Sequence, residues 1–400
     1  MRRIAVVAFA LLALLRPSQG AAQDTVPAKA AAPPKMPDPF LPRPQDISLE
    51  PASSGFGFYA ENDVFGFETD QNYTGGFAFS LGGRWVSESG LTGPLSLFDL
   101  LSDPVVHMRR AHRNREVSLH TLTILGSAFT PRRADLGIST PIVDDRPYAS
   151  LFGFQLRRVS VRRKDDPLKL SRRAVWSELT IAALGWNLAK ALQTDLHRSL
   201  RRRSGKSTPV DPQGWGNQIS NGGEPTLLYT VGIEQLLAGP SPVDPGLHGQ
   251  ATWDAQASAG YYTNVAMGVA GRIGRIRTNF WEFNSNPLNS IQQRIEASDD
   301  RHPWEAYAFA GARGRLVGYN ALLQGQFRES VHTFSGSQVN HALLEGEAGL
   351  AGAWTILGGT FTGRVMAAGR TPEFNGPRQR SHAWGAIHLS FAPRLASRSQ

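Results

Sequence analysis

Hydrophobic and polar residues alternate with a period of two along most of the chain from Phe56 onward. The alternation is clearest in four runs, 226–236, 251–261, 317–327 and 344–354. Each run has about ten residues or more, whereas a soluble strand usually has about five or six. This length suits a tilted strand that crosses a bilayer. We therefore predict an all-β fold, a transmembrane antiparallel β-barrel with a polar interior and an apolar outer face that carries aromatic residues near the strand ends.

A closed sheet follows from the lack of water in the hydrocarbon core of a bilayer. Every backbone N–H and C=O group there needs a partner within the protein, so strands can span the membrane only as a closed barrel. A soluble β-sandwich is the alternative. It explains the alternation, but it does not explain the strand length together with the export signal described below.

The period-two runs give thirteen candidate strands. They start near Phe56, Thr74, Glu116, Tyr148, Val175, Thr226, Ala251, Val265, Trp304, Val317, Leu343, Phe361 and Ala383. Single-chain bacterial barrels have an even number of strands, so this count is wrong by at least one. The last run ends at Phe391, which resembles the aromatic end of the terminal strand of such barrels, although a polar tail follows it here.

Composition and the N-terminus support export from the cytoplasm. Arg2 and Arg3 precede the apolar run 4–15, and small residues follow at 20–22, so residues 1–22 are predicted to be a signal peptide. We expect residues 23–50, rich in proline and alanine, to be a disordered leader, residues 51–392 to form the barrel, and residues 393–400 to be a polar tail. The chain has 400 residues and no cysteine, which excludes disulfides and cysteine-ligated metals.

One segment departs from the period-two pattern and contains a cluster of basic residues. Leucines recur every four residues from Leu188 to Leu200, which predicts a short helix over 188–203 with His197 beside the leucine stripe. Arginines and a lysine follow at 198–206. They are either a solvated helix end or a docking surface for phosphates or acidic head groups. The net charge of +9 and a pI of about 10.1 suit an anionic partner, without choosing between nucleic acid and lipid. Gly205-Lys206-Ser207 lacks the glycine-rich context of a nucleotide-binding loop.

A second segment, 59–76, joins the first two predicted strands and is rich in oxygen donors. It contains Glu61, Asn62, Asp63, Glu68, Thr69, Asp70, Asn72 and Thr74. Hard cations such as Ca²⁺ prefer such ligands. The same residues would also suit a polar hairpin loop without any metal.

Two further polar motifs precede predicted strands, DDRPYA at 144–149 and PQGWGNQIS at 212–220. When the strand direction alternates from a periplasmic N-terminus, the strand ends at Asp63, Thr74, Tyr148 and His197 all fall on the outer side. The sequence therefore predicts a site at the outer rim of the barrel.

These motifs, taken in order, resemble a known family. AENDVFG, TDQNYTGG, DDRPYAS, LHRSL and GWGNQI are similar in order and spacing to the lipid A 3′-O-deacylase family (LpxR-type) over about residues 55–224, and the remainder fits to the end of the chain. The resemblance implies a twelve-stranded outer-membrane barrel in a Gram-negative bacterium. It also implies a hydrolase that uses Ca²⁺ to remove the acyloxyacyl chain from the 3′ position of lipid A, the anchor of lipopolysaccharide. We therefore expect lipid A and outer-membrane lipids as partners and no nucleic acid, and no obligate protein partner is evident from the sequence.

The resemblance also implies residue roles. His197 matches the catalytic histidine, which activates a water molecule. Asn62, Asp63 and Thr74 match the residues that orient the water or the histidine and help to hold Ca²⁺. The phosphates of lipid A would meet Arg146 and the basic run that includes Arg201.

The sequence departs from the family pattern at two places. A family lysine belongs in the loop before DDRPYA, but residues 130–145 contain none. Arg132 and Arg133 lie nearby and could supply charge in a different geometry. Members commonly carry asparagine in the YTNG motif, where this chain has Gly75. These changes affect the expected activity and lipid preference rather than the fold.

Two other functions remain open. A passive barrel, such as a porin or a structural protein, would share the alternation and the export signal, and a porin would conduct ions across planar bilayers. An outer-membrane phospholipase could use the same chemistry on glycerophospholipids.

Overall fold

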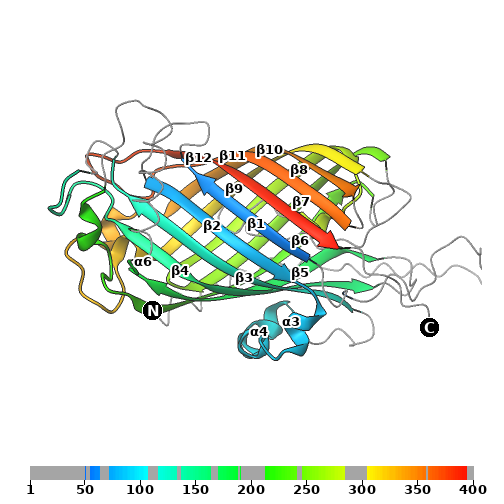
Figure 1. The fold of residues 1–400 in the computed structure, drawn as a ribbon, viewed down its shortest axis with the longest axis horizontal. Coiled ribbons are helices and arrows are strands. Elements are labelled where there is room, and N and C mark those ends of the chain that lie inside the picture. Colours follow the sequence, from blue (N-terminus) through cyan, green and yellow to red (C-terminus); the bar gives the residue numbers. More distant parts are fainter. Residues whose placement is uncertain are drawn as a thin grey trace, which may run out of the picture.

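Twelve antiparallel strands close into one barrel in the computed structural model (Figure 1). The structure describes residues 50, 55–63, 72–106, 116–132, 137–163, 170–187, 190, 212–240, 246–283, 304–356 and 359–393. Each strand pairs with its neighbour in the sequence, and β1 (Gly55–Asn62) pairs with β12 (His382–Pro393) to close the sheet. The predicted barrel is therefore confirmed.

The remaining strands follow in chain order. They are β2 (Asn72–Gly82), β3 (Glu116–Thr130), β4 (Ala149–Arg163), β5 (Leu170–Leu184), β6 (Glu224–Ala238), β7 (Gly246–Gly260), β8 (Tyr262–Ile276), β9 (Trp304–Asn320), β10 (Ala342–Ile356) and β11 (Gly359–Arg370). We call the end where β1 begins and β12 finishes the proximal end, and the opposite end the distal end. The proximal end is on the right in Figure 1.

Short helices occupy the connections. They are α3 (Arg84–Glu88), α4 (Gly93–Val106), η3 (Gly214–Asn217), η4 (Phe280–Glu282), α6 (Ala321–Gln324) and η5 (Gly336–Gln338). The pair α3 and α4 connects β2 to β3 and lies outside the barrel wall, below β3 and β5 in Figure 1. The period-two pattern did not predict this pair. Among the residues described, no helix is both long and apolar enough to cross a membrane.

One of the thirteen candidate strands, the one predicted to start near Val317, is wrong. Trp304 and Val317 belong to one strand, β9, which ends at Asn320, so the alternation expected as far as Phe327 does not continue. The side chain of Asn320 accepts a hydrogen bond from the N–H of Leu322 and caps α6. Alternating residues thus continue from a strand into a helix without a change in the sequence pattern.

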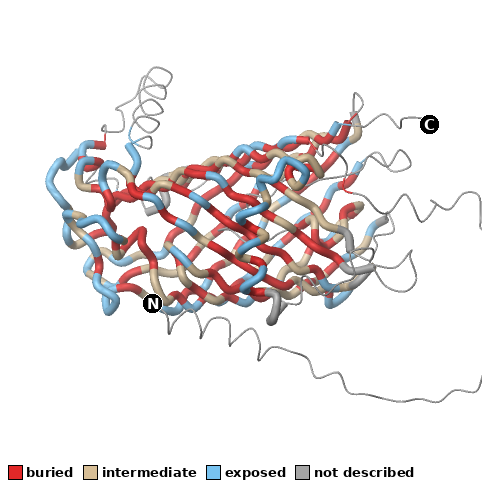
Figure 2. The backbone as a smooth tube through the Cα atoms, turned by 90° about the horizontal axis from the view of Figure 1, so that it is seen from below, coloured by how far each residue is buried: buried red, intermediate tan, exposed pale blue. Residues whose placement is uncertain are grey.

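The two faces of the sheet differ as the alternation predicted. On the outer face, Phe154, Ile181 and Leu227 are exposed side by side on β4, β5 and β6. Outward-facing aromatic residues stand near the strand ends, with Phe56, Trp304 and Trp354 at the proximal end and Trp186 just beyond the distal end of β5. In Figure 2, buried residues alternate with intermediate and exposed ones along the strands, and many exposed residues lie in the loops of the distal end.

Charged pairs cross-link the interior. Glu345 on β10 lies between Arg315 and Arg370, at 2.8 Å from the first guanidinium and 3.0 Å from the second. Arg157 pairs with Glu178, and Arg313 pairs with Asp254. These side chains are buried or nearly so, and charged side chains are rarely buried in a protein unless they are paired in this way. The lumen along these strands is therefore filled by protein groups.

Candidate functional site at the distal rim

The described parts of four family motifs gather at the distal end of the barrel, as the sequence predicted. Asn62 ends β1 and Asp63 follows it, while Gly75 lies near the start of β2. DDRPYAS leads into β4, and GWGNQI contains η3 and leads into β6. Because β1 to β4 are consecutive neighbours in the sheet, the first three of these motifs occupy one continuous arc of the rim.

The two motifs on β1 and β2 are in direct contact. A Cβ atom built on Gly75 would lie 3.1 Å from Nδ2 of Asn62 and 3.1 Å from the carbonyl oxygen of Glu61. The Asn62 amide therefore packs over Gly75, and a larger residue there would have to displace it. Asp63 is fully buried. The strand register shifts between Tyr73 and Gly75, so a β-bulge falls at Thr74, whose side chain lies outside the described part.

DDRPYAS and GWGNQI also form one packed unit. The rings of Tyr148 and Trp215 have their centroids 5.0 Å apart. The N–H of Ile219 donates to the carbonyl of Tyr148 at 2.8 Å, and Ser150 Oγ donates to Gln218 Oε1 at 2.8 Å. A Cβ atom at position 214 would lie 2.3 Å from the Tyr148 ring, so only glycine fits there. The two motifs, which are about 70 residues apart in the sequence, are therefore joined by direct tertiary contacts.

Asp145 ties the β3–β4 loop to the β11–β12 loop. Its buried carboxylate accepts hydrogen bonds from the backbone N–H groups of Arg132 and Arg146 at 2.9 and 2.7 Å, and from the guanidinium of Arg380 at 2.8 Å. Asp144 adds an ion pair to Arg378 at 2.9 Å. Two loops more than 200 residues apart in the sequence thus hold one another over the mouth of the barrel.

Arg146 does not have the exposed position expected of a phosphate ligand. Its side chain is 1% exposed, Nη1 lies 2.7 Å from Oε2 of Glu373, and its guanidinium stacks over the Phe129 ring at 4.3 Å. Burial lowers the pKa of Arg146, and the carboxylate of Glu373 offsets part of this effect. This geometry corrects the sequence-based expectation: Arg146 is an internal cation of the loop assembly. Arg132, by contrast, is exposed.

The Arg146–Glu373 pair makes the stability of the distal loops depend on pH. Burial alone would raise the pKa of Glu373, but Arg146 and Arg370 outweigh burial and bring it to about 2, from an ordinary value of 4.5. The stabilisation is therefore complete above pH 4.5 and is lost as the pH falls toward 2. We expect acid to expose these loops to pepsin over that interval. A Glu373→Gln variant should be cleaved more readily at pH 4.5, with a smaller further increase on acidification. An unchanged acid response in this variant would contradict the assignment.

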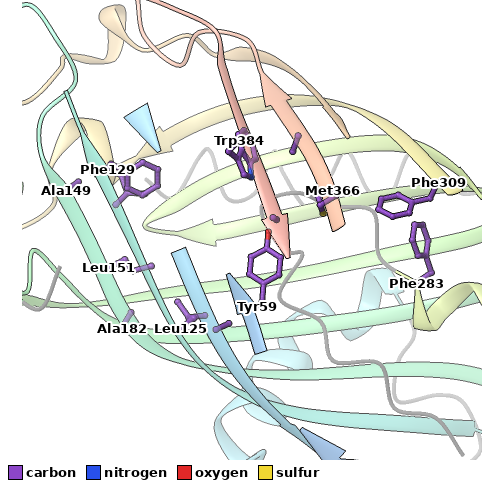
Figure 3. Close-up of a cluster of buried hydrophobic side chains, with 14 of the residues drawn as sticks. Tyr59, Leu125, Phe129, Ala149, Leu151, Ala182, Phe283, Phe309, Met366 and Trp384 are labelled. Carbon is purple, nitrogen blue, oxygen red and sulfur yellow. The ribbon is translucent and has the colours of Figure 1, made fainter. Parts of the chain in front are cut away.

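A small cavity lies inside the barrel beneath these loops. It measures about 120 Å³ and is lined by Glu61, Phe129, Gln155, Tyr261, Arg370, Glu373, His382 and Trp384 among others. Glu61 accepts hydrogen bonds from the hydroxyl of Tyr59 and the indole N–H of Trp384, at 2.5 and 3.1 Å. Figure 3 shows Tyr59 and Trp384 turned toward each other. Sites for drug-sized ligands measure roughly 300–1,000 Å³. The volume of this cavity is well below that range, so the rim is the better candidate for the site of a large substrate.

The oxygen donors at the rim are of the type that calcium prefers. Asn62 and Asp63 supply an amide and a carboxylate from adjacent positions, and neither is a soft ligand. Among the described residues, no group of three histidine, cysteine, aspartate or glutamate side chains is arranged to hold a metal. The donor chemistry of Asn62 and Asp63 thus fits Ca²⁺, and these two residues would supply part of its ligands.

Several predicted site residues lie outside the described part of the chain. They are His197, Arg133 and Arg201. Of the helix predicted over 188–203, only Lys190 is described, and it is exposed. The signal peptide and nearly all of the leader and the tail are also outside. Conversely, the sequence analysis did not identify Glu373 and Arg380 as site residues. Neither residue lies in a recognisable motif, and their contacts with Arg146 and Asp145 span more than 200 residues.

Comparisons with known proteins identify the family of the chain. No curated protein matches the chain in a direct sequence comparison. Among solved structures, LpxR from Salmonella typhimurium is similar with a TM-score of 0.58 and 13% identity, over 84% of this chain and 99% of that one. The β domain of the Bordetella autotransporter BrkA matches with a TM-score of 0.39 and 9% identity, over 86% and 100% of the two chains. The model of the family described as outer membrane protein LpxR matches residues 7–392. The chain therefore belongs to the LpxR family of outer-membrane proteins, the lipid A deacylase family that its motifs resemble.

Proposed function

We propose that this protein is a hydrolase of the outer membrane that removes the 3′-linked acyloxyacyl chain of lipid A at the distal rim. The observation that carries the proposal is the gathering of the family motifs there, with Asn62 packed over Gly75 and Tyr148 packed on Trp215. Both termini of a bacterial single-chain barrel lie in the periplasm, so the distal end is the cell-surface end, where lipid A resides.

The proposed reaction is hydrolysis by water. His197 takes a proton from the water molecule, whose oxygen attacks the carbonyl carbon of the 3′ ester. The bond between the carbonyl carbon and the 3′ sugar oxygen then breaks, and the proton passes to that oxygen, which leaves as a hydroxyl group, while the acyl chain leaves as a carboxylate. An imidazole with an ordinary pKa near 6.5 can act as such a base at neutral pH.

Asn62, Asp63 and Thr74 orient the water or the histidine, and Asp63 and Asn62 would also hold Ca²⁺. A bound calcium ion supplies positive charge that polarises the ester carbonyl and stabilises the oxyanion. What supports this assignment is the donor set, an amide and a carboxylate from adjacent positions at the distal end of β1.

Lipid A reaches the rim by lateral diffusion in the outer leaflet. Of the arginines considered for its phosphates, Arg132 is exposed and suitable, whereas Arg146 is committed to Glu373. Arg133 and Arg201 remain candidates from the sequence. An arginine at 132 or 133 would also replace the charge of the missing family lysine, with a planar guanidinium in place of a compact ammonium group.

Replacing Asp63 tests the calcium role. We expect Asp63→Asn to lose calcium-stimulated release of 3′-linked acyl chains from lipid A, because the variant keeps the size of the side chain and removes its charge. The measurement is acyl-chain release with added Ca²⁺ and with a chelator. Asp144→Asn serves as the matched control, because it removes a half-exposed carboxylate at the same end of the barrel. If chelation slows Asp63→Asn as much as the wild type, Asp63 does not hold the metal.

A passive channel fits the structure poorly. The interior pairs Arg157–Glu178, Arg313–Asp254 and Arg315–Glu345 occupy the lumen, whereas a porin keeps its lumen filled with water. A phospholipase would use the same chemistry at the same rim, so the two enzymes differ only in the lipid that is cleaved.

A further inference from the structure

Helix α4 turns Asp99, Ser102 and Leu95 toward the barrel and its other three leucines away from it. Asp99 and Ser102 are buried, whereas Leu97, Leu100 and Leu101 are 63%, 44% and 71% exposed. No charged side chain is exposed among residues 93–102, the part of α4 whose side chains the structure describes. A surface helix in water instead turns a polar face outward and confines its apolar residues to the stripe that faces the protein. The exposed face of α4 is therefore unsuited to water.

The polar face of α4 is matched by the barrel wall. Asp99 Oδ2 lies 2.7 Å from Nη2 of Arg158, and the Tyr229 hydroxyl donates to Asp99 Oδ1 at 2.9 Å. Ser102 Oγ lies 2.8 Å from the same hydroxyl, and Phe98 stacks on the Tyr229 ring with centroids 5.4 Å apart. This buried network fixes α4 to β4 and β6.

Arg158 shows which side of the wall α4 covers. Its neighbour Arg157 pairs with Glu178 inside the lumen, and successive side chains of a strand point to opposite faces. Arg158 therefore points outward, toward the lipid. An arginine there is costly unless its charge is compensated, and Asp99 supplies the compensating carboxylate. α4 thus covers a charged spot on the outer surface of the barrel.

The three exposed leucines of α4 extend the apolar outer surface that the barrel presents to lipid. The wall beneath the helix includes Leu156, Leu179 and Tyr229, which lie in the middle portions of β4, β5 and β6. One step toward the distal end, Phe154, Ile181 and Leu227 are exposed on the same outer face. Both α3 and α4 belong to the β2–β3 connection, which starts at the proximal end, so the helix pair approaches this surface from the periplasmic side.

We propose that α4 is embedded in the membrane, with Leu97, Leu100 and Leu101 in contact with the acyl chains of the periplasmic leaflet. Its 14 residues span about 21 Å along the helix axis, which is less than the roughly 30 Å of the hydrocarbon core, so α4 lies within the bilayer without crossing it. α3 forms the polar end of the insertion, with the exposed ion pair Arg84–Glu88 and with Trp85, a residue type enriched at membrane interfaces. This inference does not depend on the proposed enzymatic activity.

The absence of cysteine permits a direct test, because single labels need no background substitution. Leu101→Cys is labelled with bimane, and the full-length protein is reconstituted in phosphatidylcholine vesicles with or without brominated acyl chains. Leu97→Cys is a second probe of the same face. Val269→Cys, on the exposed outer face of β8, is the lipid control, and Ser337→Cys, in the exposed β9–β10 loop, is the water control. Closure of the barrel in each variant is checked by heat-modifiable migration in gels.

We expect brominated lipid to quench the labels at 97 and 101 at least half as strongly as the label at 269, while iodide in the buffer quenches them several-fold less than the label at 337. Quenching by iodide at the level of position 337 would overturn the proposal in favour of a helix in water. Protection from both quenchers would overturn it in favour of a protein partner, such as a second copy of this chain.

Discussion

His197→Ala should slow the release of 3′-linked acyl chains from lipid A by about 10² to 10⁴-fold, which is the usual contribution of a general base. The reason is that alanine cannot take the proton of the attacking water. The loss should appear in the turnover rate, while binding of lipid A remains close to that of the wild type. The measurement is initial rates on lipid A in mixed micelles at saturating Ca²⁺.

A histidine elsewhere on the same end of the barrel controls for nonspecific damage. His341 lies in the β9–β10 loop, where its ring contacts the backbone carbonyls of Val317 and Gly336. We expect His341→Ala to keep most of the activity. If His197→Ala retained the wild-type rate, the assigned base would be wrong and another group at the rim would have to activate the water.

Glu345→Gln should destabilise the barrel by about 3–5 kcal/mol, the usual effect of removing one partner from a buried ion pair. Glu345 is the shared partner of Arg315 and Arg370, and all three side chains are almost fully buried. The neutral amide would remove the compensating charge of Arg315 and one of the two carboxylates that Arg370 contacts, the other being Glu373. Urea titrations of protein in vesicles, followed by tryptophan fluorescence, would measure the free energy of unfolding.

An exposed ion pair provides the contrast for this measurement. Glu88 pairs with Arg84 on α3, and the two side chains are 61% and 42% exposed, respectively. We expect Glu88→Gln to change the free energy of unfolding by less than about 1 kcal/mol. Equal effects of the two substitutions would mean that the interior pairs do not hold the barrel together.

The barrel could be predicted from the sequence because its strands have one face in lipid and one face in a polar interior. That difference sets a period of two, which needs no knowledge of distant residues. The same reasoning failed at 317–327, where the alternation runs from β9 into α6 and only the cap at Asn320 marks the boundary. It also missed α4, because a helix with leucines outside and Asp99 inside resembles neither a strand nor an ordinary surface helix.

The site was predictable in its location and less so in its contacts. The direction of the strands placed Asn62, Asp63 and the DDRPYAS motif at one end, and the structure has them there. The partner of Arg146 could not be foreseen, because Glu373 lies 227 residues away and its loop carries no motif. An arginine in a polar motif therefore looked like a ligand for phosphate, although the fold uses it to join two loops.

Mass spectrometry of lipids after incubation with the purified protein tests the central claim most directly. Wild-type protein, with Ca²⁺, is presented with outer-membrane vesicles that contain both lipopolysaccharide and glycerophospholipids. The account predicts that lipid A loses the mass of its 3′-linked acyloxyacyl group while the phospholipids stay intact. Lipid A that keeps this group, or phospholipids that lose their acyl chains in its place, would contradict it.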